Sequence, residues 1–276
     1  MKIKILVDNI SNIPELKAEH GFSLLAENEN ARILFDTGVS ENIIVNSEFF
    51  KIQLKNIDFL IISHNHYDHT GGMKFVKKYL SQKTKLIIGK DFFKEKYKKN
   101  KSDYRKISSD FMDANESSVF FEIRCVNNIM KISDNIFVLR LLNGKSILND
   151  YFYIKDENEC FIEDNFHEEI ILVYKNTDGL TVISGCSHTG IENIIKTVNL
   201  FFYNERIMAI IGGLHLENTQ DKYFFELTDM LKQYNIKLFP GHCTGESRLK
   251  QLKDILKDNC EIIEIGKEII INHEII

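Results

Sequence analysis

The sequence has few of the features that divide a chain into domains or direct it to a membrane. It contains only two prolines and no Gly/Ser-rich linker, which favours one domain over residues 1–276. No apolar run approaches the roughly 20 residues of a membrane span. The apolar run between Lys2 and Asp8 is too short for the core of a secretory signal. We therefore expect a cytoplasmic protein with no membrane partner.

Cysteine pairs and excess positive charge are also lacking. The five cysteines form an odd, scattered set without a Cys-x-x-Cys pair, which argues against a disulfide framework and for a reducing compartment. The formal net charge is −5 and the pI is near 6.0. A chain with this charge has no general electrostatic attraction to nucleic acid, so we expect no such partner. The oligomeric state stays open.

Short apolar runs alternate with segments of helical period through most of the chain. Many runs are continuously apolar, which is typical of strands covered on both faces, and the alternation predicts an α/β fold with helices outside the sheets. Helices are predicted within 73–80, 191–198, 224–231 and 249–256. Strands are predicted at 3–7, 23–26, 32–35, 57–62, 86–88, 136–141, 170–174, 180–184, 207–211, 236–239 and 260–265.

The stretch from about residue 90 to 164 is different, because it is polar and has only short apolar islands. We interpret it as an irregular insertion over the functional site. Within it, residues 90–106 (KDFFKEKYKKNKSDYRK) hold eight basic and three acidic residues with aromatics between them. The favoured interpretation is a solvated helix face with Phe92, Phe93 and Tyr97 packed inward. The alternative is a segment that attracts a phosphate or carboxylate substrate.

The stretch SHNHYDHTGG (63–72) follows a predicted strand and gathers side chains that bind metals. His64 and His66 lie two positions apart, which places both on the same side of an extended segment. Asp68 and His69 follow at once, and the glycines allow a sharp turn. Imidazole and carboxylate suit zinc, iron or manganese, and a catalytic site leaves one coordination position open for water.

Three further histidines each follow an apolar run within a glycine-containing turn: His188 in TVISGCSHTG, His215 in IIGGLHL and His242 in KLFPGHCTG. A single histidine of this kind is more often a core or loop residue, but the repetition at strand ends favours a metal centre. Cys186 and Cys243 flank two of these histidines, and a thiolate can bind zinc. Because neighbouring residues on an extended segment point opposite ways, we interpret both cysteines as buried packing residues.

The first motif resembles the H-x-H-x-D-H signature of the metallo-beta-lactamase superfamily. Further blocks (LVDN, LFDTG, SGCSHTGIENI, GGLHL and GHCTG) are similar to the branch that includes the methanopterin-pathway dihydropterin synthase and its bacterial relatives. The resemblance implies an αββα four-layer sandwich, the metallo-beta-lactamase fold. It also implies two divalent metal ions at one edge of the sandwich, with zinc favoured and iron or manganese as alternatives.

The resemblance also implies a ligand set: His64, His66 and His188 for one metal, and Asp68, His69 and His242 for the other. Asp36, in LFDTG, would orient a ligand rather than bind metal. The sequence departs from the family at the Asp that commonly bridges the two metals, because Gly212 and Gly213 stand where it is expected. Water, substrate or His215 would then complete the second site.

The function implied is a metal-dependent hydrolase that acts on an ester, thioester, lactone or phosphoester through a dinuclear centre and a bridging hydroxide. Asp68 would position that water or accept its proton. A small-molecule substrate is expected, with an anionic one as an option. The alternative is a dihydropterin-transferring synthase that releases pyrophosphate. An iron redox protein and a metal-bound binding protein are weaker alternatives, the first because His66 stands where such proteins usually have Glu.

Overall fold

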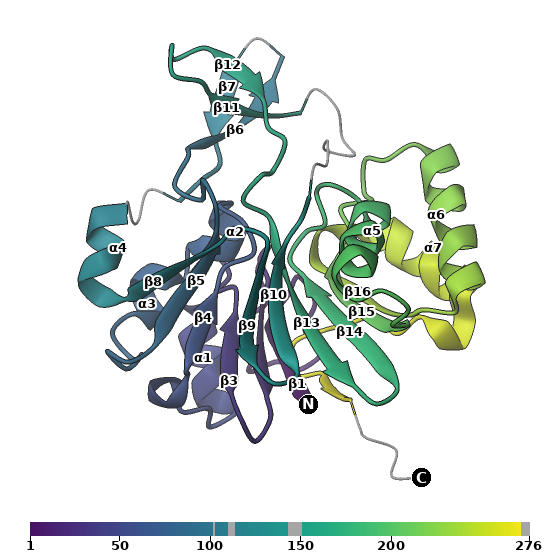
Figure 1. Ribbon diagram of the computed structural model, residues 1–276, viewed down its shortest axis with the longest axis horizontal. Helices are drawn as coiled ribbons and strands as arrows, with labels where there is room; N and C mark the ends of the chain where they lie inside the picture. Colours follow the sequence, from purple (N-terminus) through teal and green to yellow (C-terminus); the bar gives the residue numbers. More distant parts are fainter. Residues whose placement is uncertain (102, 110–113, 143–150, 272–276) are drawn as a thin grey trace.

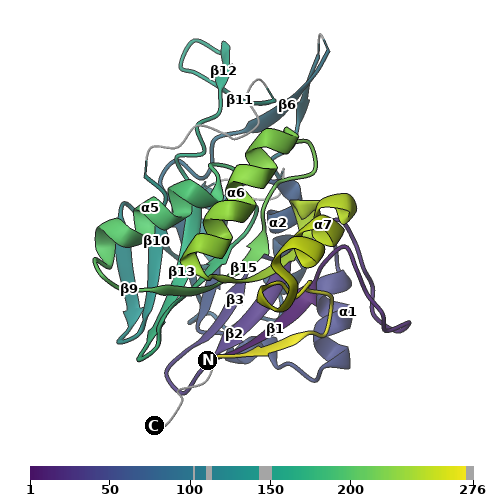
Figure 2. The same ribbon diagram turned by 90° about the vertical axis from the view of Figure 1, so that its right-hand side faces the viewer.

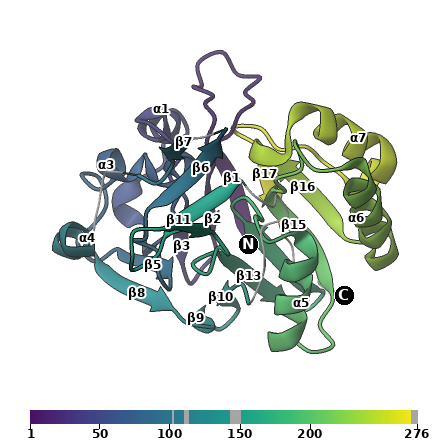
Figure 3. The same ribbon diagram turned by 90° about the horizontal axis from the view of Figure 1, so that it is seen from above.

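The protein is described by a computed structural model that covers residues 1–101, 103–109, 114–142 and 151–271. Two β-sheets lie face to face, and helices cover the outer face of each (Figures 1 and 2). The layers follow in the order helix, sheet, sheet, helix, which confirms the predicted αββα sandwich. A smaller third sheet lies above one edge of the sandwich (Figure 3).

The first main sheet has seven strands in the order β17-β1-β2-β3-β4-β5-β8. Strands β3, β4, β5 and β8 are parallel, whereas β1 pairs antiparallel with β2 and β17. Helices α1 and α3 pack on its outer face. The bounds are β1 Lys2–Val7, β2 Ser23–Glu27, β3 Arg32–Phe35, α1 Asn42–Phe49, β4 Phe59–Ile61, α2 Tyr67–Thr70, α3 Met73–Val76, β5 Lys85–Gly89, α4 Ala114–Phe120, β8 Glu122–Val126 and β17 Glu268–Ile270.

The second main sheet has six strands in the order β16-β15-β14-β13-β10-β9, of which β14, β15 and β16 are parallel. Helices α5, α6 and α7 cover its outer face (Figure 2). No helix in the described part of the chain has the length and apolar character to cross a bilayer. The bounds are β9 Ile129–Ser133, β10 Ile136–Arg140, β13 Ile170–Asn176, β14 Gly179–Ser184, α5 Ile191–Phe201, β15 Ile207–Gly213, α6 Asp221–Tyr234, β16 Lys237–Gly241 and α7 Glu246–Leu256.

Strand β13 shows why the strands are continuously apolar. Ile170 and Leu172 belong to the core between the two sheets, whereas Ile171 and Val173 pack against the helices. All four side chains are fully buried, because successive side chains of a strand point to opposite faces and both faces are covered here. Each such side chain contributes about 1.5–3 kcal/mol to the stability of the sandwich.

The region 90–164 differs from the irregular insertion that we predicted. Strand β8 within it belongs to the first main sheet, and β9 and β10 belong to the second. Only its remaining strands form the third sheet, in the order β12-β11-β6-β7. Residues 90–106 contain two strands, so the predicted helix was wrong. Aromatic packing with a distant segment explains the outcome, since the ring of Phe161 in β12 contacts Tyr97 of β6 and stacks on Tyr104 of β7, with ring centroids 5.0 and 3.8 Å apart. The bounds are β6 Lys96–Asn100, β7 Asp103–Lys106, β11 Phe152–Lys155 and β12 Phe161–Glu163.

One predicted strand is absent from the structure, and one helix was not predicted. The segment 260–265 is not a strand: it forms an isolated bridge between Leu238 and Cys260 and a few backbone hydrogen bonds beside β16, while β17 takes the edge beside β1. Helix α1 was not predicted, because it buries the polar Asn46 beside Ile43 and Ile44. The amide of Asn46 donates hydrogen bonds to backbone carbonyls of Leu6 and Lys17, so a polar residue occupies a core position.

A buried ion cluster joins the third sheet to the sandwich. The Lys96 ammonium of β6 lies 2.7 Å from the Asp164 carboxylate and 2.7 Å from the Glu168 carboxylate, and all three side chains are 2–3% exposed. Asp164 and Glu168 lie in the segment that leads into β13. The cluster therefore fixes the third sheet over the edge of the main sheets.

We predict that Lys96→Ala lowers the free energy of unfolding by about 3–5 kcal/mol, because it leaves two buried carboxylates without a cation. Urea denaturation measures the change. Lys94→Ala is the control, since it removes only an exposed ion pair with Asp91 and should cost about 1 kcal/mol or less. Equal urea midpoints for the two variants would show that the buried cluster does not stabilise the fold.

Candidate metal centre

The residues predicted as ligands meet at one edge of the sandwich, beneath the third sheet. Strand β3 leads directly to Asp36, β4 to the segment of His64, β14 to that of His188 and β16 to His242. The carboxyl ends of parallel strands meet at the same sheet edge, where side chains of several loops can converge. The two sheets face each other, so this edge collects side chains from both.

The first group of donors consists of His64, His66 and His188. One ring nitrogen of each lies within 4.8 Å of the others, and all three side chains are buried. The Nε2 atoms of His64 and His188 are 3.2 Å apart. Among the described residues, Nε2 of His66 has no hydrogen-bond partner. Burial holds the pKa of all three histidines well below the usual value, so they are neutral and offer lone pairs.

The second group consists of Asp68, His69 and His242, and the sulfur of Cys186 lies within the same 4.8 Å. Nε2 of His242 is 3.2 Å from Nε2 of His69 and 3.3 Å from Oδ2 of Asp68. Burial opposes ionisation of Asp68, but His69 and His242 hold its pKa well below the usual range. Although burial favours the neutral ring, the hydrogen bond to Asp68 raises the pKa of His242 to about 9. A metal ion would therefore compete with a proton at His242.

Asp36 connects the two groups on the side away from the cavity. Its buried carboxylate accepts hydrogen bonds from the Ser63 backbone N–H and hydroxyl and lies against Nδ1 of His69, each at 2.7 Å. The Ser63 hydroxyl is also 2.9 Å from Nδ1 of His64. A carboxylate that accepts the Nδ1 proton of a histidine leaves Nε2 with a lone pair directed at the site. Asp36 thus contacts a donor residue but does not face the cavity.

Other carboxylates hold the backbone beside the donors. Glu169 accepts a hydrogen bond from the His188 backbone N–H at 2.8 Å, and Asp8 accepts one from the His242 backbone N–H at 3.0 Å. The side-chain oxygen of Asn9 is 3.1 Å from Nδ1 of His242. Both histidines are therefore fixed at the backbone.

Comparison with known proteins identifies the family. The family model described as the metallo-beta-lactamase superfamily matches residues 16–195. The chain belongs to the metallo-beta-lactamase superfamily. This result confirms the resemblance of the H-x-H-x-D-H motif, and members of this fold typically bind divalent metal ions.

Two relatives come from Methanocaldococcus jannaschii. The uncharacterized protein MJ0448 is 31% identical over 263 residues, which cover 92% of this chain and 94% of the relative. The 7,8-dihydropterin-6-methyl-4-(beta-D-ribofuranosyl)-aminobenzene-5'-phosphate synthase is 28% identical over 274 residues, covering 91% of this chain and 89% of the synthase. Among solved structures, Tm1679, a metal-dependent hydrolase of the beta-lactamase superfamily, is 31% identical with a TM-score of 0.81, covering 99% of this chain and 100% of that one.

The family's bridging Asp has no space in this chain. A Cβ atom on Gly213 would lie 2.5 Å from the sulfur of Cys243, and one on Gly212 would lie 1.9 Å from the Ser184 carbonyl oxygen. His215 does not take the place of that Asp in the second group. A ring nitrogen of His215 instead lies within 4.8 Å of the sulfurs of Cys186 and Cys243, which form a third cluster with it.

The structure also revises the interpretation of the two cysteines. Both are buried, as predicted, but the Cys186 sulfur lies 3.0 Å from Nε2 of His69 instead of pointing away from the donors. If residues 186–188 were extended, the Cys186 side chain would be expected to pack away from the donors. Ser187 has a φ of +57°, so the chain turns between Cys186 and His188 and both side chains reach the site.

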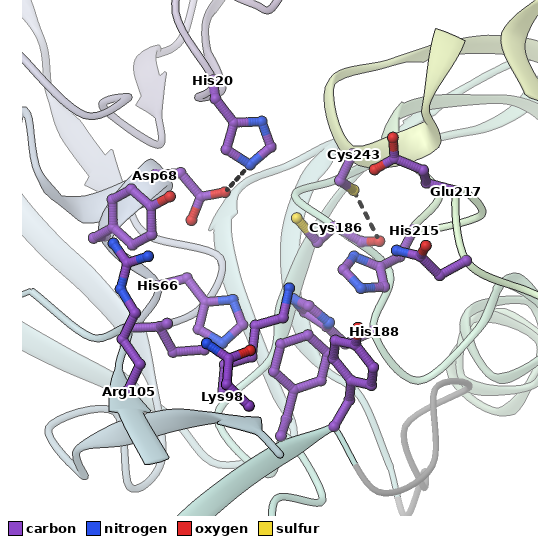
Figure 4. Close-up of a pocket in the computed structure, with 16 residues that line it drawn as sticks. His20, His66, Asp68, Lys98, Arg105, Cys186, His188, His215, Glu217 and Cys243 are labelled. Atoms are coloured by element: carbon purple, nitrogen blue, oxygen red, sulfur yellow. Dashed lines mark hydrogen bonds and ion pairs between the residues drawn. The ribbon is translucent and has the colours of Figure 1, made fainter. Parts of the chain in front are cut away.

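A cavity of about 240 Å³ opens from the donors towards the third sheet (Figure 4). His20 lies at its mouth, half-exposed, with Nε2 3.4 Å from Oδ2 of Asp68. Most of the wall could not be predicted from the sequence, because its residues come from polar segments without periodicity. These residues include His20, Lys98, Asn100, Arg105, Tyr151, Phe152, Glu217 and Asn218.

The donors fit divalent metal ions in kind and spacing. At zinc–nitrogen distances of about 2.0–2.1 Å, neighbouring donors of a tetrahedral site lie about 3.4 Å apart. The pairs His64–His188, His69–His242 and Asp68–His242 lie 3.2, 3.2 and 3.3 Å apart. Imidazole rings and one ionised carboxylate are ligands that zinc, iron and manganese accept.

We predict that Asp36→Asn weakens metal binding about 10–100-fold, because the amide cannot replace a carboxylate that fixes Nδ1 of His69. Competition with a chromogenic chelator measures the affinity. Asp58→Asn is the matched control, since Asp58 accepts a hydrogen bond from Arg32 at the opposite ends of β3 and β4. Unchanged affinity in Asp36→Asn would exclude an orienting role for Asp36.

Proposed function

We propose that the protein is a metallo-hydrolase with a dinuclear centre, and that zinc is the metal at both positions. The first group, His64, His66 and His188, would hold one ion, and Asp68, His69 and His242 would hold the other. The observation that carries the proposal is the arrangement of these two buried groups side by side at the base of one cavity. The similarity to Tm1679, a metal-dependent hydrolase, supports it.

When bound, two divalent ions supply Lewis-acid activation of water and compensate negative charge on a reacting oxygen. The side chains of the protein orient the attacking water and provide a path for its proton. Asp68 lines the cavity as an ionised carboxylate, so it can accept a hydrogen bond from the attacking water and orient it. His20 lies 3.4 Å from Oδ2 of Asp68 and is 56% exposed, which gives the proton a path to solvent.

The wall of the cavity opposite the donors favours an anionic substrate. Lys98 of β6 and Arg105 of β7 line it together with Asn100 (Figure 4). The guanidinium group binds phosphate and carboxylate oxygens in pairs, and the ammonium group adds a second positive charge. This agrees with the alternative interpretation of residues 90–106, in which the basic segment attracts an anion. A phosphoester is therefore favoured over a neutral ester or lactone.

A pterin transferase that releases pyrophosphate is the second candidate. The 28% identity to the dihydropterin synthase over most of both chains favours it. Lys98 and Arg105 would suit a departing pyrophosphate as well as a phosphoester. The two reactions differ in the acceptor, which is water in the hydrolase and an aminobenzene ribose phosphate in the synthase.

We predict that the purified protein contains two zinc ions per chain and hydrolyses phosphoesters only while the metals are bound. Elemental analysis and a panel of phosphatase, phosphodiesterase, esterase and lactonase substrates, with and without chelator, test this. Activity should return when zinc is added back. A robust hydrolysis that survives chelation would contradict the mechanism. Pyrophosphate release from a dihydropterin pyrophosphate, without hydrolysis in the panel, would identify the transferase instead.

We predict that Arg105→Ala raises KM for the best phosphoester about 10–100-fold, because a hydrogen bond to a charged group is worth about 1.5–3 kcal/mol. The KM of a neutral ester should not change. Lys106→Ala is the matched control, since Lys106 is the next residue of β7 and forms an ion pair with Glu95 instead of lining the cavity. An equal rise in KM for both substrates would rule out recognition of the anion by Arg105.

A further inference from the structure

The second donor group has three ligands of the kinds found in this family, whereas zinc is usually held by four donors. The nearest additional donor is the sulfur of Cys186, 3.0 Å from Nε2 of His69. One donor atom each of Asp68, His69, Cys186 and His242 lies within 4.8 Å of the others, and all four side chains are buried. In Figure 4 the Cys186 sulfur points toward Asp68.

The local backbone explains how a thiol reaches this position. Ser187 has a φ of +57°, and its hydroxyl donates a hydrogen bond to the Gly213 carbonyl at 2.8 Å and lies 3.0 Å from the Ser184 hydroxyl, from which it can accept one. This turn directs His188 to the first group and Cys186 to the second. The turn is anchored to β15, so the placement of the sulfur does not depend on a mobile side chain alone.

The Cys243 thiol beside Cys186 fills the space in which the family carries its bridging carboxylate. A Cβ atom on Gly213 would lie 2.5 Å from the Cys243 sulfur and 3.4 Å from Cα of Cys186. Glycine at 213 and cysteine at 243 are therefore linked features of this chain. A side chain at 213 would displace the Cys243 sulfur, and that sulfur leaves no room for such a side chain.

We propose that Cys186 binds the second metal ion as a thiolate, together with Asp68, His69 and His242. This inference rests on the dinuclear centre of the proposed function. When the metal–sulfur bond forms, the S–H bond breaks and the proton leaves through the cavity to solvent, so no oxidant or reductant is required. Thiolate is a soft ligand, which makes this position selective for zinc, cobalt or cadmium over manganese.

The test uses the full chain reconstituted with two equivalents of Co(II). The wild-type protein should show the near-ultraviolet charge-transfer band of a thiolate bound to Co(II), and Cys186→Ser should lose it. Cys243→Ser is the matched control and should keep the band, because Cys243 is buried beside Cys186 but is not among the four donors. Loss of a residue that only hydrogen-bonds a ligand lowers metal affinity about 10–100-fold. Cys186→Ser should lower the affinity for Cd(II) by more than this, and the affinity for Mn(II) by less than the affinity for Cd(II).

X-ray absorption of the wild-type zinc protein provides a measurement that requires no variant. Because one of the two zinc ions is expected to have a sulfur ligand, the spectrum should show an average of one sulfur for every two zinc ions. Two bound Co(II) ions without the thiolate band, or a zinc spectrum without sulfur, would overturn the role of Cys186 and leave the dinuclear centre intact. Loss of the band in Cys243→Ser alone would also overturn it and assign the metal to the cluster with His215. A wild-type chain that binds no Co(II) would overturn the proposed function as well.

Discussion

The carboxylate of Asp36 is the interaction on which the rest of the site depends. It is fully buried, it accepts two hydrogen bonds from Ser63, and it lies against the ring of His69. Through the Ser63 hydroxyl it also reaches His64 of the other donor group. A buried charge that loses one of its partners is costly, so the two groups cannot shift independently. The register of β3 beside β4 therefore fixes the spacing between them.

Close approach of the two sheets is the second constraint. A Cβ atom on Gly185 would lie 2.2 Å from the Ser63 hydroxyl, so the end of β14 can reach the end of β4 only without a side chain at that position. A Cβ atom on Gly89 would similarly lie 1.9 Å from the carbonyl oxygen of Glu168. These contacts bring His64 and His188, which are 124 positions apart in sequence, to 3.2 Å. The donor side chains therefore meet because the backbones of the two sheets approach closely at this edge.

Features that are local in the chain could be predicted from the sequence. Apolar runs and the histidines that follow them are local patterns, so the αββα layers and the six proposed ligands could be read from them. Features that depend on distant partners could not. Asn46 makes α1 look irregular until its bonds to other segments are known, and Arg105 resembles a solvated surface residue until the third sheet places it over the cavity. The direction of Cys186 depended on one backbone angle, at Ser187.

The charges around the cavity bear on the choice of substrate. Burial keeps the histidines of the first group neutral, so Asp68 is the one negatively charged side chain that we assign to ligand binding besides the proposed Cys186 thiolate. Two divalent ions bound there would carry more positive charge than these ligands compensate, and Lys98 and Arg105 add to it from the opposite wall. A neutral ester would meet this field without compensating it. A phosphoester, in contrast, would place negative charge where both walls attract it, so the arrangement that we propose for the activation of water would also select the anion.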